Sequence, residues 1–137
     1  MKIFMTFNPH IENLSQNYLL NRFITTLKKY YRKQLGPRYY KHKNEQYNIG
    51  IFQEIGSTDY KQPHLHIIVD VPVAYIQRFY NFMKDGLTTI FPHLTSDCQM
   101  IKSGKYDEAN VYRYCSKEGG TIIANSDLYQ KITFVNW

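Results

Sequence analysis

Hydrophobic residues recur at two spacings along this chain, and each spacing predicts one kind of element. In residues 2–8 every second residue from Ile3 onward is large and apolar, which predicts a β-strand. Over residues 15–35 the apolar positions follow helical spacing. They are Leu20, Phe23, Ile24, Leu27 and Tyr31. Gly36-Pro37 is expected to end this helix.

The middle of the chain predicts a hairpin followed by a second helix. Residues 47–55 and 63–70 each read as a strand, and the polar residues 56–62 between them are typical of a turn. Pro72 suits the first turn of a helix. The apolar residues after it repeat at helical spacing up to Gly86, where we expect the helix to stop.

The residues after the second helix predict the last elements of the chain. Residues 96–101 predict a short strand, residues 107–118 a helix, and residues 121–123 and 132–135 further strand segments. The order β-α-β-β-α-β is that of the split βαβ or ferredoxin-like fold, an α+β arrangement with helices packed on one face of an antiparallel sheet. We expect one domain over residues 1–137, with the other sheet face free to carry a site.

Composition narrows the class of protein. Hydrophobic residues make up 43% of the chain and charged residues 20%, which is typical of a folded protein. The apolar runs are too short for a membrane span or a signal peptide, so we expect no membrane association. The two cysteines, Cys98 and Cys115, form neither a disulfide framework nor a metal-binding pair, which favours an intracellular location.

The net charge of +6 is concentrated in one segment. Between Glu12 and Glu45 there is no acidic residue, whereas cations recur among tyrosines. The cations are Arg22, Lys28, Lys29, Arg32, Lys33, Arg38, Lys41 and Lys43. Clustered cations bind phosphates and aromatic rings stack on unpaired bases, so Lys28, Lys29, Arg32 and Lys33 are candidate DNA contacts. The alternative is a solvated basic helix face.

The most specific local feature is the pair of histidines in His64-Leu65-His66. Side chains alternate across a strand, so the two imidazoles share one face while Leu65, Ile67 and Val69 point to the other. Two neighbouring imidazoles can chelate one divalent ion. The alternative is a pair of histidines that merely occupy a surface.

Glu54 is the candidate third ligand. Ile49 and Ile51 define the buried side of the preceding strand, so Glu54 lies on its opposite face. In a hairpin with the histidine strand, Glu54 falls near His66. Two imidazoles and one carboxylate leave coordination positions open for water and substrate, as a catalytic metal site requires. Glu54 could instead be an exposed strand carboxylate.

Tyr114 and Lys117 form the third candidate element. They are three residues apart, and on a helix this spacing places them on one face. A phenol with the usual pKa of about 10 is a poor nucleophile until a cation stabilises the phenolate. The same Tyr-x-x-Lys spacing also occurs at Tyr30 and Tyr40, so the spacing alone does not select a nucleophile.

Taken in order, these elements resemble the HUH superfamily, and most closely the replication-initiator (Rep) nuclease domain of small rolling-circle replicons. Residues 4–9, which include Thr6 and Asn8, are similar to the family's first motif, which helps to hold single-stranded DNA. Residues 63–66 match the second, metal-binding motif, and residues 114–119 are similar to the third, which carries the nucleophile. The resemblance covers nearly the whole chain.

The resemblance implies a metal-dependent endonuclease that nicks and joins single-stranded DNA at a replication origin and so initiates rolling-circle replication. Tyr114 would attack the phosphate and form a 5′-phosphotyrosine intermediate, with Lys117 assisting. Glu54, His64 and His66 would hold Mn²⁺ or Mg²⁺. No Gly-x-x-x-x-Gly-Lys-Ser/Thr loop is present in this sequence, so either a separate helicase is recruited or this chain is the excised N-terminal domain of a longer protein.

Three alternatives stay open. A small HUH transposase shares the chemistry. A non-catalytic ferredoxin-like nucleic-acid-binding module fits the 16% aromatic content, although the aromatic motif of RNA-recognition sheets is missing. A two-histidine phosphoesterase is suggested by His93-Leu94-Thr95, but its required second His-x-Thr/Ser is absent.

Overall fold

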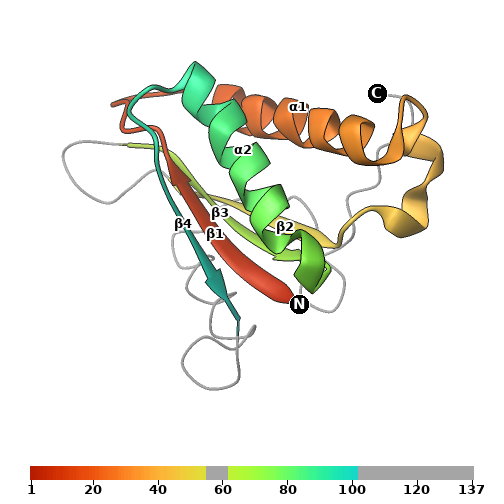
Figure 1. Ribbon diagram of the computed structural model, residues 1–137. Helices are drawn as coiled ribbons and strands as arrows, with labels where there is room; N and C mark the ends of the chain where they lie inside the picture. Colours follow the sequence, from red (N-terminus) through yellow and green to blue (C-terminus); the bar gives the residue numbers. More distant parts are fainter. Residues whose placement is uncertain (55–61, 102–137) are drawn as a thin grey trace.

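The computed structural model describes residues 1–54 and 62–101 (Figure 1). Within them, the strands and helices run in the order β1 Lys2–Asn8, α1 Gln16–Leu35, β2 Ile49–Glu54, β3 His64–Asp70, α2 Ile76–Ile90 and β4 Thr95–Met100. Short 3₁₀ turns occupy Tyr39–Lys41, Lys43–Glu45 and Val73–Tyr75. The helix expected over residues 107–118 and the strand segments expected after it lie outside the described residues.

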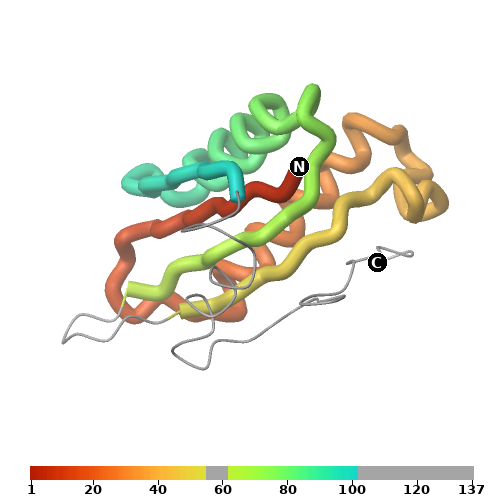
Figure 2. Tube along the Cα trace, turned by 90° about the horizontal axis from the view of Figure 1, so that it is seen from below, coloured from red at the N-terminus to blue at the C-terminus, as the bar shows by residue number. Residues whose placement is uncertain are grey.

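The four strands form one antiparallel sheet in the order β2-β3-β1-β4, and Figure 2 shows them side by side in that order. With α1 following β1 and α2 following β3, this is the expected split βαβ arrangement, so the predicted α+β fold is confirmed. The order makes β1 and β3 the central strands. Residues on β3 therefore have a strand neighbour on both sides.

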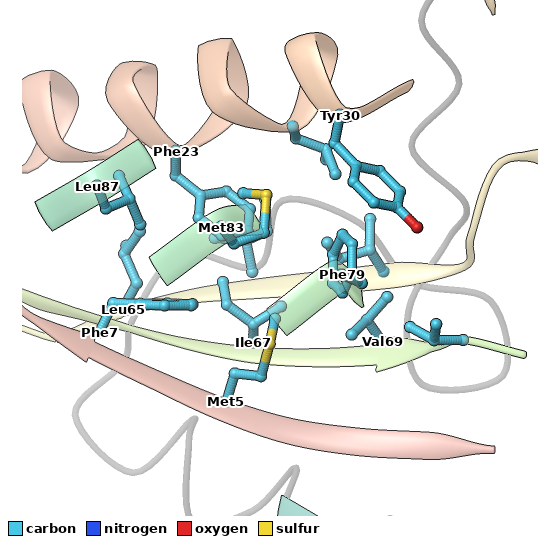
Figure 3. Packing of buried hydrophobic residues seen from close by; sticks show 14 of the residues in the cluster. Met5, Phe7, Phe23, Tyr30, Leu65, Ile67, Val69, Phe79, Met83 and Leu87 are labelled. Atoms are coloured by element: carbon cyan, nitrogen blue, oxygen red, sulfur yellow. The ribbon is translucent and has the colours of Figure 1, made fainter. Parts of the chain in front are cut away.

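Both helices cover the same face of the sheet (Figure 1). The alternation predicted for β1 places Ile3, Met5 and Phe7 in the core, fully buried beneath the helices. Figure 3 shows Phe23 of α1 and Phe79 of α2 packed over the helix-facing residues of β1 and β3. This layer buries most of the large apolar side chains of the described residues, and it supplies the hydrophobic stabilisation of the fold.

Single residues set the two ends of α1. The hydroxyl of Ser15 accepts a hydrogen bond from the backbone N–H of Tyr18, which caps the helix start. Gly36 follows the last turn with φ of 89°, in the left-handed region that favours glycine. The predicted boundaries are thus confirmed. The buried stripe is rotated slightly from the predicted one, since Leu19 and Tyr30 are buried whereas Leu20 and Ile24 are half-buried.

The prediction that Gly86 stops the second helix is wrong. Helix α2 begins at Ile76, after a 3₁₀ turn that follows Pro72, and continues through Gly86 to Ile90. Gly86 faces α1, where an added Cβ would lie 2.7 Å from the Cγ2 methyl of Thr26. The glycine thus permits two helices to approach closely instead of ending one of them.

Three tyrosines tie the end of α1 to the start of β2. The hydroxyl groups of Tyr30 and Tyr47 are 2.6 Å apart, and the hydroxyl of Tyr31 accepts a hydrogen bond from the backbone N–H of Tyr47 at 3.0 Å. Burial raises the pKa of Tyr30 and Tyr31 well above the usual value, because a buried phenolate would lose its hydration. This cluster therefore depends on protonated phenols.

Candidate metal centre

The face of the sheet that no described helix covers carries the chemically active side chains. On β3 the alternation that sends Leu65, Ile67 and Val69 toward the helices sends His64 and His66 the other way. On β2, Ile49 and Ile51 face the helices, so Glu54 shares the face of the two histidines. The sequence prediction that these three residues lie on one face is therefore confirmed.

The hairpin register brings the three side chains together. Glu54 pairs with His64 across β2 and β3. Glu54 Oε2 lies 2.9 Å from His64 Nε2 and 3.1 Å from His66 Nε2, so one carboxylate oxygen contacts both imidazoles. Glu54 and His66 are buried, with 3% and 4% of their surface exposed, and His64 is partly exposed. Glu54 is thus not an exposed strand carboxylate, and His66 is not a surface residue.

The hydrogen bonding of His64 shows that a cation fits this site. Its Nδ1 lies 3.0 Å from the carbonyl oxygen of Gln62, which can only accept a hydrogen bond, so Nδ1 carries the proton. A neutral His64 then presents the lone pair of Nε2 to Glu54 Oε2. Two acceptors at 2.9 Å repel each other unless a proton or a metal ion lies between them.

The geometry of the donors also fits a metal ion. The three donor atoms lie within 4.8 Å of one another. With metal–ligand bonds of about 2.1 Å, adjacent positions of an octahedron are about 3.0 Å apart, close to the two separations from Glu54 Oε2. The other carboxylate oxygen, Oε1, is buried and has no hydrogen-bond partner within residues 1–54 and 62–101. This group of three residues could therefore hold a metal ion.

Strand β1 supplies two contacts to His66. Thr6 pairs with His66 across β1 and β3, and its Oγ1 lies 3.1 Å from His66 Nδ1. The ring of Phe4 stacks on the imidazole, with centroids 5.4 Å apart and an angle of 15° between the planes. From its motif, Thr6 was predicted to be a DNA contact and not a neighbour of His66. The predicted split βαβ fold makes the first and third strands neighbours, but the register that pairs these two residues appears only in the structure.

The remaining candidate residues lie in three places. Asn8 is on the same sheet face, and its side-chain oxygen accepts a hydrogen bond from the backbone N–H of His10. The four candidate DNA contacts of α1 belong to the helical layer, on the side of the sheet opposite to the metal centre: Lys28, Lys29, Arg32 and Lys33. Tyr114 and Lys117 lie outside the described residues.

Two of these candidate cations of α1 lie against aromatic rings. The guanidinium of Arg32 lies 5.9 Å from the centre of the Tyr39 ring, and Lys33 Nζ lies 5.7 Å from that of Phe82. Both side chains remain exposed. These cation–π contacts hold the charges at the surface, where they can meet either water or a polyanion.

Comparison with known proteins found no relative of this chain. Family models, curated proteins and solved structures were all searched, and none of them matches the chain. Within the part of the chain that the structure describes, no helix is long and apolar enough to cross a membrane. Any functional assignment therefore depends on the chemistry of the site and on the motifs in the sequence.

Proposed function

We propose that this protein is a metal-dependent endonuclease of the HUH type, which nicks and joins single-stranded DNA and initiates rolling-circle replication. The observation that carries the proposal is the contact of one Glu54 carboxylate oxygen with the Nε2 atoms of both His64 and His66, on the sheet face that no described helix covers. Two histidines from one strand with a hydrophobic tail, plus an upstream carboxylate, form the donor set that the sequence resemblance implies for this activity.

The donor set favours Mn²⁺ over Mg²⁺. Magnesium prefers oxygen ligands, whereas imidazole nitrogens suit the later divalent metals. When bound, the ion supplies Lewis-acid polarisation of a phosphate oxygen and a fixed template for the substrate. Glu54, His64 and His66 would supply three ligands, which leaves coordination positions for a phosphate group.

The proposed chemistry at the DNA belongs to Tyr114 and Lys117. The phenolic oxygen of Tyr114 forms a bond to phosphorus, and the bond from phosphorus to the 3′-oxygen breaks. The phenol proton is lost, and the leaving 3′-oxygen takes up a proton. Lys117, three residues along, stabilises the negative charge of the phenolate with its ammonium group. The phosphotyrosine preserves the energy of the broken phosphodiester, so a 3′-hydroxyl can reverse the reaction and join the strand.

A covalent adduct tests the proposal directly. The protein is incubated with a pool of random single-stranded oligonucleotides and Mn²⁺, denatured in SDS and analysed for protein that carries DNA. We expect an adduct with the wild type and none with Tyr114→Phe, which loses only the hydroxyl. Tyr112→Phe is the matched control, because Tyr112 is a neighbouring tyrosine outside the third motif, and it should retain the adduct.

Each other outcome has a defined meaning. An adduct that persists in Tyr114→Phe and disappears in Tyr112→Phe would reassign the nucleophile. An adduct that needs no divalent ion would remove the metal from the reaction. DNA binding without any adduct, across the whole pool and with Mn²⁺ present, would favour the non-catalytic nucleic-acid-binding module.

A further inference from the structure

We propose that Thr6 is a positioning residue of the metal centre: its hydroxyl holds the His66 ring so that Nε2 stays directed toward Glu54 and can serve as a metal ligand. This inference rests on the metal centre of the proposed function, but not on its reaction with DNA. Thr6 lies within hydrogen-bonding distance of His66 and is absent from the group of three metal-binding residues.

The Nδ1 atoms of the two histidines face different kinds of hydrogen-bonding group. His64 Nδ1 faces the Gln62 carbonyl oxygen, which only accepts, so the tautomer of His64 is fixed with the proton on Nδ1. His66 Nδ1 faces the hydroxyl of Thr6, which can donate or accept. Of the two histidines, only His66 can therefore change tautomer while keeping the contact of its Nδ1 atom.

That freedom matches the two states of the centre. Without a metal ion, His66 Nε2 lies 3.1 Å from Glu54 Oε2 in an ion-pair contact that lacks hydrogen-bond geometry, while the Thr6 hydroxyl can donate to Nδ1. With a metal ion, Nε2 must offer its lone pair, so the proton moves to Nδ1 and Thr6 accepts it. A valine at position 6 has no hydroxyl, so it could neither donate a hydrogen bond to Nδ1 nor accept one from it.

The backbone makes this contact rigid. Thr6 and His66 are paired residues of the two central strands, so their separation is set by the sheet. Threonine is branched at Cβ, which restricts the rotation that would carry Oγ1 away from the imidazole. Phe4 stacks on the same ring from the adjacent position on that face and limits its tilt. Strand β1 thus fixes the ring in two directions.

The test is Mn²⁺ binding measured by isothermal titration calorimetry, with no DNA present. Loss of a group that orients a metal-binding histidine costs about 10–100-fold in metal affinity. We expect Thr6→Val to weaken Mn²⁺ binding by about that factor, because valine keeps the shape and the branch but lacks the hydroxyl. Thr6→Ser keeps the hydroxyl and should stay much closer to the wild type.

A second threonine–histidine pair on β4 provides the matched control. Thr95 Oγ1 lies 2.6 Å from His10 Nε2, and His10 is not a member of the metal-binding group. Thr95→Val therefore removes a contact of the same chemistry without touching His66, and Mn²⁺ affinity should not change. Nitrogen-15 spectra of the histidine rings give an independent readout: in the wild type with bound Zn²⁺, a diamagnetic ion that imidazole suits, the protonated ring nitrogen of His66 should be Nδ1.

The outcomes separate this inference from the proposed function. Equal Mn²⁺ affinity of Thr6→Val and wild type would overturn the role of Thr6 while leaving the metal centre in place. Equal losses in Thr6→Val and Thr6→Ser would show a requirement for shape, not for the hydroxyl, and would also overturn it. A wild type that binds no divalent ion would overturn the metal centre and this inference together. Metal binding without any DNA adduct would refute the nuclease alone.

Discussion

The two faces of the one sheet differ in what their side chains do. The helix-covered face is filled mainly by buried apolar residues of β1, β2, β3 and both helices. The opposite face carries Glu54, His64 and His66, held by specific polar contacts and by a buried position. The same strands supply both faces, since successive side chains point in opposite directions.

Because of this alternation, one residue of a strand contributes to the stability of the core while the next contributes to the candidate site. Ile67 is fully buried beneath the helices, whereas His66, the residue before it, contacts Glu54. A substitution of Ile67 changes the core, and a substitution of His66 changes the candidate metal centre. The pair therefore allows the two contributions to be measured in one strand.

The largest effect is expected from Ile67→Ala. Truncation of a buried isoleucine removes apolar contacts and leaves a cavity, so the free energy of unfolding should fall by about 2–5 kcal/mol. Urea denaturation without added metal measures this change. Ile67→Val is the milder control, with a loss of about 0.5–1.5 kcal/mol. A loss with Ile67→Ala no greater than with Ile67→Val would mean that this face does not carry the stability.

The next effect is stabilisation by metal, which belongs to the opposite face. At a Mn²⁺ concentration of about 100 times the dissociation constant, a site present only in the folded state adds about 2.7 kcal/mol to the free energy of unfolding. Glu54→Gln keeps the size of the side chain but removes the charged ligand, so this gain should disappear. Ile67→Val should keep it. A gain of the same size in Glu54→Gln would place the ion elsewhere.

The smallest effect concerns the tyrosine cluster on the helix-covered side at alkaline pH. Buried Tyr30 and Tyr31 have raised pKa values, so they keep their protons in the folded state at pH values where the unfolded chain loses them. Their stabilisation is fully present below pH 10 and is lost as pH rises above it, by up to about 1.4 kcal/mol per pH unit for each phenol.

Tyr31→Phe should therefore flatten the alkaline loss of stability, as measured by urea denaturation at a series of pH values. Burial also raises the pKa of Cys98, from 9.0 to about 11, so its contribution is lost over that lower interval. Cys98→Ala should remove the decline that begins near pH 9 and leave the later one. An unchanged pH profile in Tyr31→Phe would contradict the assignment to this phenol.

Much of the fold could be predicted from the sequence, because alternation and helical spacing are local properties. They gave all four described strands, both helices and the face of each candidate metal ligand. Gly86 shows where local reasoning fails: glycine disfavours helix in isolation, but here it meets Thr26 of another helix, and that contact depends on the packing of α2 against α1.

The candidate metal centre was predictable to the same degree. The identity and face of Glu54, His64 and His66 follow from residue type and parity. The register that pairs Glu54 with His64, and Thr6 with His66, does not, because a shift of one strand against its neighbour changes no local pattern. The positioning contacts of a site thus depend on long-range register, which a single sequence does not specify.

The Gln62 carbonyl has a consequence for how this centre can evolve or be redesigned. Because the acceptor for His64 is a backbone atom, any residue that preserves the backbone at position 62 preserves the contact, and point mutation cannot easily remove it. The corresponding acceptor for His66 is a side chain, which a single nucleotide change can replace. The contact that orients His64 is therefore robust to mutation, whereas the contact that orients His66 can be changed. Attempts to change metal preference should vary position 6 and leave the hairpin turn alone.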